Sequence, residues 1–178
     1  MQKTNIKIEG NRIYLRESEL SDVNQTYVNW LSDPEVNQYL EIRHKVQTMD
    51  SVHDYVKQKI VKKDELLFSI CLNKNDIHIG NIKLGPINLI HKYAEISLFI
   101  GDKNEWGKGL ATEAIYTLSN YAFDTLKLHK LTAGCYANNI GSVKAFKKAG
   151  FIEDGIWKNQ YLCNGEYVDR ICLAMINR

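Results

Sequence analysis

The sequence contains little proline, no long apolar run and almost no excess charge. Only 2 of its 178 residues are proline, and we find no repeat or low-complexity stretch that would serve as a linker. No run approaches the roughly 20 apolar residues that a membrane-spanning helix needs. The net charge of +2 argues against a protein whose main role is to coat nucleic acid. We therefore expect neither a membrane nor a nucleic-acid partner.

Cysteine is also scarce, and the spacing of the cysteines matches no disulfide or metal-binding pattern. The four cysteines lie far apart with no C-x-x-C pattern, and the first residues do not resemble a signal peptide. We expect free thiols in a cytoplasmic protein. The five histidines show no ligand spacing beside these cysteines, so we expect no metal site.

The chain contains enough apolar residues to form one hydrophobic core. Hydrophobic residues make up 44% of the chain and aromatic residues 10%, and 178 residues leave no room for a second domain of ordinary size. We predict a single domain over residues 1–178.

Hydrophobic periodicity predicts the order of the elements. Alternating patterns predict a hairpin at residues 6–16 and strands at 66–72, 77–87, 93–100, 130–136, 155–163 and 166–176. Helical spacing predicts helices at 21–31 with Ser21 as the cap, at 33–36, at 48–63, from the glycine pair to about 126, and at about 141–150. Asn164-Gly165 marks the turn of the last hairpin. This order predicts a mixed α/β (α+β) fold in which helices cover the faces of a sheet.

Two glycines precede the long helix in DKNEWGKGLATEA, residues 102–114. Gly107 and Gly109 leave the backbone bare where unpaired N–H groups carry the positive end of the helix dipole, and such a position favours phosphate. The spacing fits neither a P-loop, because Lys108 stands between the glycines, nor a dinucleotide fold, because a third glycine is missing. The alternative is a turn that only lets strand and helix pack closely.

Four segments in this order carry a family resemblance: residues 11–40, 94–114, NNIGSVKAFKKAGF at 138–151 and NGEYVDRICLAM at 164–175. Together they resemble the GNAT superfamily of acyl-CoA-dependent N-acetyltransferases, and within it the branch of the ribosomal-protein alanine acetyltransferases RimJ and RimL. The resemblance covers nearly the whole chain. It implies a single-domain GNAT fold, with a mixed, mostly antiparallel twisted sheet and helices on both faces.

The resemblance implies acetyl-CoA as the acyl donor, with its pyrophosphate on the main-chain amides of the glycine turn and Lys108 as a nearby cation. Asn104 stands where the family pattern has Gln or Arg, so the backbone is expected to carry most of the binding. Asn139 and Ser142 match polar positions beside the pantetheine, and they can equally cap a helix. The expected cofactor-binding residues are Phe99, Ile100, Trp106, Gly107, Lys108, Gly109, Leu110, Ala111, Thr112, Asn139 and Ser142.

Acetyl transfer to an amine needs a base, because an alkylammonium has a pKa of about 10.4 and only the neutral amine attacks. Glu95 interrupts an apolar strand and shares a face with Ser97 and Phe99. The resemblance gives a glutamate at this position the role of base, usually through a water. The alternative is a glutamate that is solvated or paired with a lysine. A strand N–H near Phe99 or Ile100 would polarise the thioester carbonyl.

Phe146 stands where many superfamily members have a tyrosine that protonates the departing thiolate. A phenyl ring has no proton to give, so Ser97, Cys135 or Tyr136 would have to replace it. Alternatively the thiolate leaves unassisted, since a thiol pKa near 8.5 makes it a tolerable leaving group. The expected catalytic residues are Glu95, Ser97 and Tyr136.

The acceptor pocket of the family is built by the first two helices and the last hairpin. The expected substrate-binding residues here are Tyr39, Glu41, Arg43 and Tyr161, with Trp30 and His44 nearby. For Trp30 we favour a place in the core.

The acceptor is expected to be a small-molecule or peptide amine. Residues 30–44 are similar to openings of sugar-nucleotide N-acetyltransferases, so an amino-sugar nucleotide stands narrowly before a protein N-terminus, a polyamine and an aminoglycoside. A homodimer is a further expectation. The competing hypothesis is a catalytically silent acetyl-CoA-binding or sensing domain that has lost the acid, and it predicts no release of CoA thiol with any amine.

Overall fold

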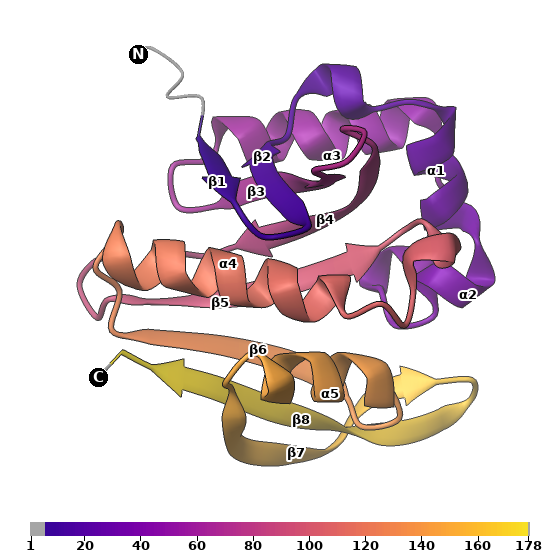
Figure 1. Cartoon of the computed structure of the whole chain (residues 1–178). Coiled ribbons are helices and arrows are strands. Elements are labelled where there is room, and N and C mark those ends of the chain that lie inside the picture. The colour runs from indigo at the N-terminus through magenta and orange to yellow at the C-terminus, as the bar shows by residue number, and fades with distance from the viewer. Residues whose placement is uncertain (1–5, 178) are drawn as a thin grey trace.

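A computed structural model describes residues 6–177 of the chain. One eight-stranded sheet runs through it in the order β1-β2-β3-β4-β5-β6-β8-β7 (Figure 1). The strands are β1 (Lys7–Glu9), β2 (Ile13–Glu17), β3 (Leu66–Leu72), β4 (His78–Leu84), β5 (Tyr93–Ile100), β6 (Lys130–Tyr136), β7 (Ile152–Cys163) and β8 (Glu166–Ile176). Neighbouring strands are antiparallel except β5 and β6, which are parallel. The predicted mixed, mostly antiparallel sheet is confirmed.

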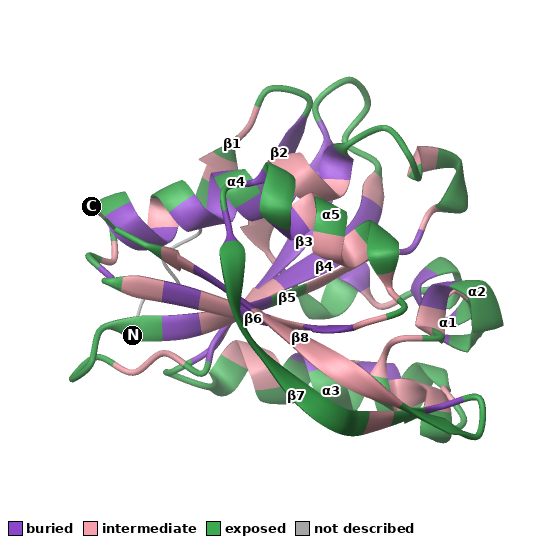
Figure 2. Cartoon of the chain, turned by 90° about the horizontal axis from the view of Figure 1, so that it is seen from below, coloured by how far each residue is buried: buried purple, intermediate pink, exposed green. Residues whose placement is uncertain are grey.

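Helices cover both faces of this sheet, as predicted. They are α1 (Gln25–Ser32), α2 (Pro34–Asn37), α3 (Met49–Val61), α4 (Leu110–Asp124) and α5 (Ile140–Lys148), with short 3₁₀ turns at Leu20–Asp22, Glu41–His44 and Lys103–Glu105. Figure 2 shows α4 and α5 on one side of the strands and α3 on the other, while most of β7 is exposed.

The core is divided between the two faces by strand alternation. The larger cluster joins the sheet to α4 and α5, and the smaller one packs α1 and α3 against Leu67 and Phe99. On β5 the buried Ala94 and Ile96 belong to the larger cluster. Since successive side chains alternate, Glu95 lies with Phe99 on the face that α1 and α3 cover. Trp30 packs against the smaller cluster, which confirms its expected place in the core.

Three boundaries differ from the prediction by three residues or more. Strand β4 ends at Leu84 rather than at Ile87. Ser21 lies in a 3₁₀ turn, and α1 begins four residues after it, because Asn24 is the residue whose side chain accepts the N–H of Tyr27 at 3.0 Å. Strand β7 begins at Ile152 rather than Gly155, because Gly155 takes a φ of 158° inside the strand, where the register shifts. A pattern of side chains does not reveal such a bulge.

Several other sequence features take their expected form. Thr48 caps α3, accepting the N–H of Ser51 at 3.1 Å, and Pro34 occupies the first turn of α2. Asn164 and Gly165 have φ values of 52° and 84°, as the predicted tight hairpin turn requires. The four cysteines are free. Within residues 6–177 no helix combines the length and apolar character needed to cross a membrane.

Candidate active site

The site is a cleft that opens where β5 and β6 stop pairing. Their parallel register ends at the pair Glu95 and Thr132. Beyond it, β5 stays paired with β4 as far as Ile100, and β6 stays paired with β8 as far as Tyr136. The strands therefore separate (Figure 1), and their remaining residues line a cleft of about 1050 Å³.

The main chain of β5 turns alternate N–H groups into this cleft. The Glu95 carbonyl accepts the Gly85 N–H, and the Gly101 N–H donates to the Ile79 carbonyl, so both residues face β4. In an antiparallel pair such bonds recur at every second residue. The N–H groups of Leu98 and Ile100 therefore face the separated side, whereas that of Phe99 faces β4. Of the two donors expected from the sequence, Ile100 has the suitable direction, and Leu98 is a second donor that the sequence did not reveal.

The glycine turn forms one end of the cleft. Gly107 and Gly109 both line it and have left-handed φ values of 74° and 78°, which residues with a Cβ rarely adopt. A Cβ added at Gly107 would have no atom within 4 Å. A Cβ added at Gly109 would meet only the Arg12 side chain, at 3.6 Å. Conformation rather than crowding thus requires glycine, and close packing does not explain the turn. Gly109 is the N-cap of α4 and gives no side-chain cap, which leaves the first N–H groups of α4 available to an anion.

Lysines of α5 bring positive charge to the same cleft. Lys108 lies beside the turn, but its Nζ pairs with Glu105 at 3.0 Å and it is not among the lining residues. Lys144 and Lys148 do line the cleft. The ten other expected cofactor-binding residues all line it as well.

The N-terminus of α5 holds the remaining polar positions of this wall. Asn139 caps the helix through an Oδ1 that accepts the N–H of Ser142 at 3.1 Å, and Ser142 Oγ lies 3.3 Å from Cys135 Sγ. Burial raises the pKa of the Cys135 thiol. Phe146 also lines the cleft, is 2% exposed, and meets Phe151 edge-on with ring centres 5.1 Å apart. The capping role of Asn139 is confirmed.

Glu95 stands at the point of separation and is held by an arginine from β8. Arg170 Nη2 donates to Glu95 Oε1 at 3.0 Å, and it crosses β6 to do so. A Cβ at Gly134 would lie 2.1 Å from Arg170 Nε, so only glycine on β6 lets the arginine pass. Glu95 is 41% exposed and lies beside the cleft rather than among its lining residues. Its partner is an arginine, where the alternative from the sequence was a lysine.

The expected acceptor residues meet around one phenol. Tyr136 OH donates to Glu41 Oε1 at 2.6 Å and accepts from both terminal nitrogens of Arg43, at 3.0 and 2.9 Å. Its ring stacks on Tyr161 at 4.0 Å and lies 5.5 Å from the Tyr39 ring. The structure therefore brings all four expected acceptor residues together with Tyr136.

The environment of Tyr136 makes its hydroxyl a reluctant proton donor. Burial and the hydrogen bond to Glu41 raise its pKa to about 12, although Arg43 acts in the opposite direction. The proton is also shared with Glu41 already. Among the three possible acids, Tyr136 is therefore the one whose proton is already engaged by a carboxylate.

Some functional candidates could not be found from spacing alone. Lys83, Leu98, Gly134, Lys144 and Lys148 line the cleft, and Arg170 binds Glu95. For Lys83 the sequence does contain a signal. Side-chain alternation along β4 and β5 places Lys83 on the same face of the sheet as Ser97. His44, by contrast, is exposed and does not line the cleft. No group of three or more possible metal ligands occurs within the described part of the chain.

Comparison with known proteins agrees with this geometry. Residues 12–152 match the model of the acetyltransferase (GNAT) domain. A probable N-acetyltransferase of Bacillus subtilis, YjcK, is 30% identical, with 96% of this chain and 97% of that protein covered. A spermidine N(1)-acetyltransferase of Vibrio cholerae is 31% identical, covering 66% of this chain and 62% of that protein.

A solved structure shows the same fold. Spermidine N-acetyltransferase from Vibrio cholerae, crystallised with CoA and spermine, aligns with a TM-score of 0.82 and 24% identity. The alignment covers 93% of this chain and 95% of that one.

Proposed function

This chain belongs to the GNAT acetyltransferase family and is an acetyl-CoA-dependent N-acetyltransferase, and from that premise we propose that it acetylates a primary amine bound beside Tyr136. The observation that carries the proposal is the separation of β5 from β6 beyond Glu95. It joins the bare glycine turn, the Ile100 N–H and the tyrosine cluster in a single cleft.

Support for the donor site comes from the glycine turn. The N–H groups of Gly107 to Thr112 start a helix without a side-chain cap, and an anion suits such a terminus. Lys144 and Lys148 add charge from α5, while Asn139 and Ser142 line the wall between turn and strand. When bound, acetyl-CoA supplies the acetyl group as an activated thioester. The V. cholerae relative crystallised with CoA agrees with this assignment.

Three groups of the chain would then carry the chemistry. The N–H of Ile100, with that of Leu98 beside it, polarises the carbonyl that the amine attacks. Glu95 accepts the amine proton through a water, since it lies at the opening of the cleft and not within it. Arg170 positions the Glu95 carboxylate by donating to Oε1 alone.

The fate of the thiolate depends on the groups near Phe146. Ser97 and Cys135 line the cleft and remain candidate acids. Because Tyr136 already donates to Glu41, we assign it to acceptor binding in the first place. Unassisted departure remains the alternative, as the ordinary thiol pKa near 8.5 allows it.

Two classes of acceptor compete. The names of relatives favour a polyamine, because one is a spermidine N(1)-acetyltransferase. The similarity of residues 30–44 to sugar-nucleotide N-acetyltransferases favours an amino-sugar nucleotide, with a protein N-terminus and an aminoglycoside behind it. We place the enzyme in the cytoplasm, where thiols stay reduced, and its four free cysteines agree with that.

Thiol release with a panel of amines tests the proposal. The purified chain is mixed with acetyl-CoA and spermidine, UDP-glucosamine, an alanine-initiated peptide or kanamycin, and mass spectrometry identifies the acetylated amine. We expect release to depend on at least one amine and to require Glu95. Tight acetyl-CoA binding without release for any amine would instead support the silent sensing domain.

A further inference from the structure

Lys83 is a basic residue of the cleft that the proposed chemistry does not use. It lies on β4 in register with Leu67 of β3 and Ser97 of β5, and all three residues line the cleft. Lys83 is partly buried. Within residues 6–177 its Nζ forms no ion pair or hydrogen bond, whereas the neighbouring Lys59 is bound to Glu65.

The acidic residues of the cleft are already engaged. Glu35 pairs with Lys103 at 2.7 Å and Glu105 pairs with Lys108 at 3.0 Å. Glu41 accepts the Tyr136 hydroxyl at 2.6 Å. Within residues 6–177 these are the three carboxylates that line the cleft, against five lysines, of which Lys59 is already paired with Glu65. The cleft therefore offers more free positive than negative charge, which opposes a bare polycation.

Burial of Lys83 without a partner is costly. Desolvation lowers the pKa of its ammonium, and Lys59 and Lys62 act in the same direction, against the nearby Glu65 and Glu95. A partly desolvated cation regains free energy when an anion reaches it. Glu65 and Glu95 are near enough to act on this pKa, but neither forms an ion pair with Lys83 Nζ among the described residues, so a bound anion would supply the missing direct partner.

The cofactor pyrophosphate does not reach this position. Lys83 is opposite Ser97, and at about 3.3 Å per residue it lies roughly 10 Å along β5 from Ile100, which leads to the glycine turn. Its side chain also shares the Ser97 face, on which α3 and the acceptor residues lie. The anion therefore belongs to the acceptor side of the cleft.

We infer that Lys83 Nζ binds a phosphate of the acceptor, so that the substrate is a primary amine carrying phosphate, as in an amino-sugar phosphate or nucleotide, and not a polyamine. This inference rests on the proposed acetyl transfer and names its substrate class. Lys83 is a specificity-determining residue that acts on acceptor binding.

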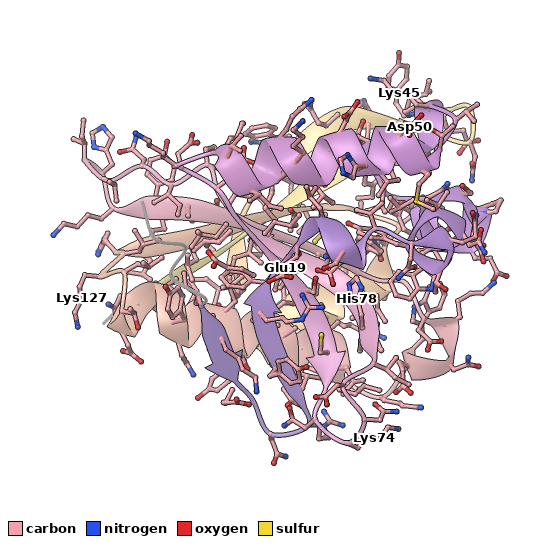
Figure 3. All side chains as sticks on the ribbon, turned by 90° about the horizontal axis from the view of Figure 1, so that it is seen from above. Glu19, Lys45, Asp50, Lys74, His78 and Lys127 are labelled. Carbon is pink, nitrogen blue, oxygen red and sulfur yellow. The ribbon has the colours of Figure 1, made fainter. Side chains whose placement is uncertain are left out.

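Matched acceptors and matched variants test the assignment. The acceptors are glucosamine, glucosamine 6-phosphate, UDP-glucosamine and spermidine. The variants are Lys83→Met, Lys83→Glu and the control Lys74→Met, whose exposed lysine lies at the β3–β4 turn, far from α3 in Figure 3. Wild type should prefer a phosphate-bearing amine, and the two phosphate acceptors distinguish a sugar phosphate from a nucleotide.

The variants should separate recognition from structure. We expect Lys83→Met to lower kcat/KM for the preferred phosphate acceptor about tenfold or more, mainly through KM, because a charge-assisted hydrogen bond is lost. Turnover of glucosamine, the acetyl-CoA Kd and the Lys74→Met control should stay within about threefold. Lys83→Glu should lower kcat/KM for the phosphate acceptor further and raise kcat/KM for spermidine. Equal losses for glucosamine and its phosphate would overturn the inference.

Calorimetry on the CoA-saturated protein keeps the inference separate from the proposed function. Binding of UDP-glucosamine or glucosamine 6-phosphate that Lys83→Met weakens tenfold, without any turnover, supports the phosphate site and contradicts acetylation of that amine. Turnover of spermidine with no binding of either phosphate compound supports the acetyltransferase and overturns the phosphate site. Absence of any phosphate binding and any turnover overturns both.

Discussion

At the scale of single residues, the environment of Glu95 explains how a charged side chain is kept at the opening of the cleft. Arg170 crosses β6 over Gly134 and donates to one carboxylate oxygen at 3.0 Å, and its guanidinium lies 4.6 Å from the Trp157 ring. The arginine is thus fixed by a glycine below it and an aromatic ring beside it. Such positioning is what a base acting through a water needs.

Replacing Glu95 tests the base directly. Glu95→Gln keeps the shape of the side chain and removes the proton acceptor, so kcat should fall about a hundredfold to ten-thousandfold, while the acetyl-CoA Kd stays the same. Stopped-flow thiol release and calorimetry measure the two quantities. The exposed carboxylate of Glu166 provides the control as Glu166→Gln. Near-normal turnover of Glu95→Gln at neutral pH would assign Glu95 a structural role.

The missing tyrosine at Phe146 gives a second residue-scale prediction. Because Tyr136 already donates to Glu41, Tyr136→Phe should raise the acceptor KM more than it lowers kcat, and the pH profile of kcat should keep its shape. If Ser97 or Cys135 is the acid, its alanine variant should lower kcat and alter that profile. If the thiolate leaves unassisted, only Phe146→Tyr should change the rate.

The series also has an outcome that would refute this assignment of roles. A large loss of kcat in Tyr136→Phe, with unchanged acceptor KM, would make Tyr136 the acid after all. Phe146→Tyr needs a separate check of stability, because a buried hydroxyl without a partner costs about 1–3 kcal/mol.

Residues that act through contacts across several strands were the ones that the sequence could not reveal. Gly134 reads as an ordinary strand glycine and Arg170 as a charge in the last hairpin, and only strand order brings them to Glu95. Lys83 is similar, since its lack of a partner depends on which carboxylates the fold places nearby. Local features such as the Thr48 cap and the Asn164-Gly165 turn were predictable because their partners are neighbours in the chain.

At the scale of elements, function depends on two strands that stop pairing and on a helix that begins uncapped. The sequence predicted both strands and the helix start, because alternation and the glycine pair are local. It did not predict where β5 and β6 separate, since register depends on long-range packing. The direction of the Ile100 N–H follows from that register and not from residue type.

The glycine turn gives the prediction at this scale. Gly109→Val places a β-branched residue at a φ of 78°, which distorts the start of α4 and puts a side chain where the anion approaches. Acetyl-CoA affinity should fall at least tenfold by calorimetry. Gly165→Val is the control, because Gly165 has a similar left-handed φ of 84° and lies outside the cleft lining. Unchanged affinity in folded Gly109→Val would refute the turn as the phosphate site.

At the scale of the whole molecule, a buried ion pair joins the N-terminal hairpin to the rest of the sheet. Arg16 Nη1 donates to Asp22 Oδ2 at 2.8 Å, and Asp22 also accepts from the Glu19 N–H and the Ser69 hydroxyl. Burial raises the pKa of Asp22, but these hydrogen bonds outweigh it and hold the pKa below its ordinary value. Asp22 thus ties β2 and β3 to the 3₁₀ turn before α1.

The sign of this shift predicts how stability depends on pH. A depressed carboxyl pKa contributes stability above the unfolded-state pKa of about 3.9, and the contribution is lost as pH falls through the lower folded-state pKa. Asp22→Asn should cost about 3 kcal/mol at pH 7, the lower end for a broken buried ion pair because Arg16 is partly exposed, or about 6–12 °C in Tm. The difference from wild type should shrink below about pH 4.

Thermal unfolding followed by circular dichroism over pH 3–8 measures this difference. Asp54→Asn is the control, since Asp54 is exposed on α3 and should change Tm little. A constant difference between wild type and Asp22→Asn across the whole range would show that the ion pair is not the cause.

The fold and the family describe the molecule as a whole. They do not determine which amine the enzyme acetylates or whether two copies of the chain assemble. The family match covers residues 12–152, and the aligned V. cholerae structure at 24% identity shows only the fold. The expected homodimer, the RimJ and RimL branch and the acceptor stay predictions, because they depend on surface and cleft side chains.

A crystal structure of the chain with CoA tests the central claim most directly. We predict the pyrophosphate on the N–H groups of Gly107 to Thr112, and the pantetheine between β5 and β6 with its sulfur near the Ile100 N–H. CoA bound elsewhere, such as in the smaller hollow between α4 and the β1–β2 turn, would contradict the account. Strands β5 and β6 that stay hydrogen-bonded along their whole length would contradict it as well.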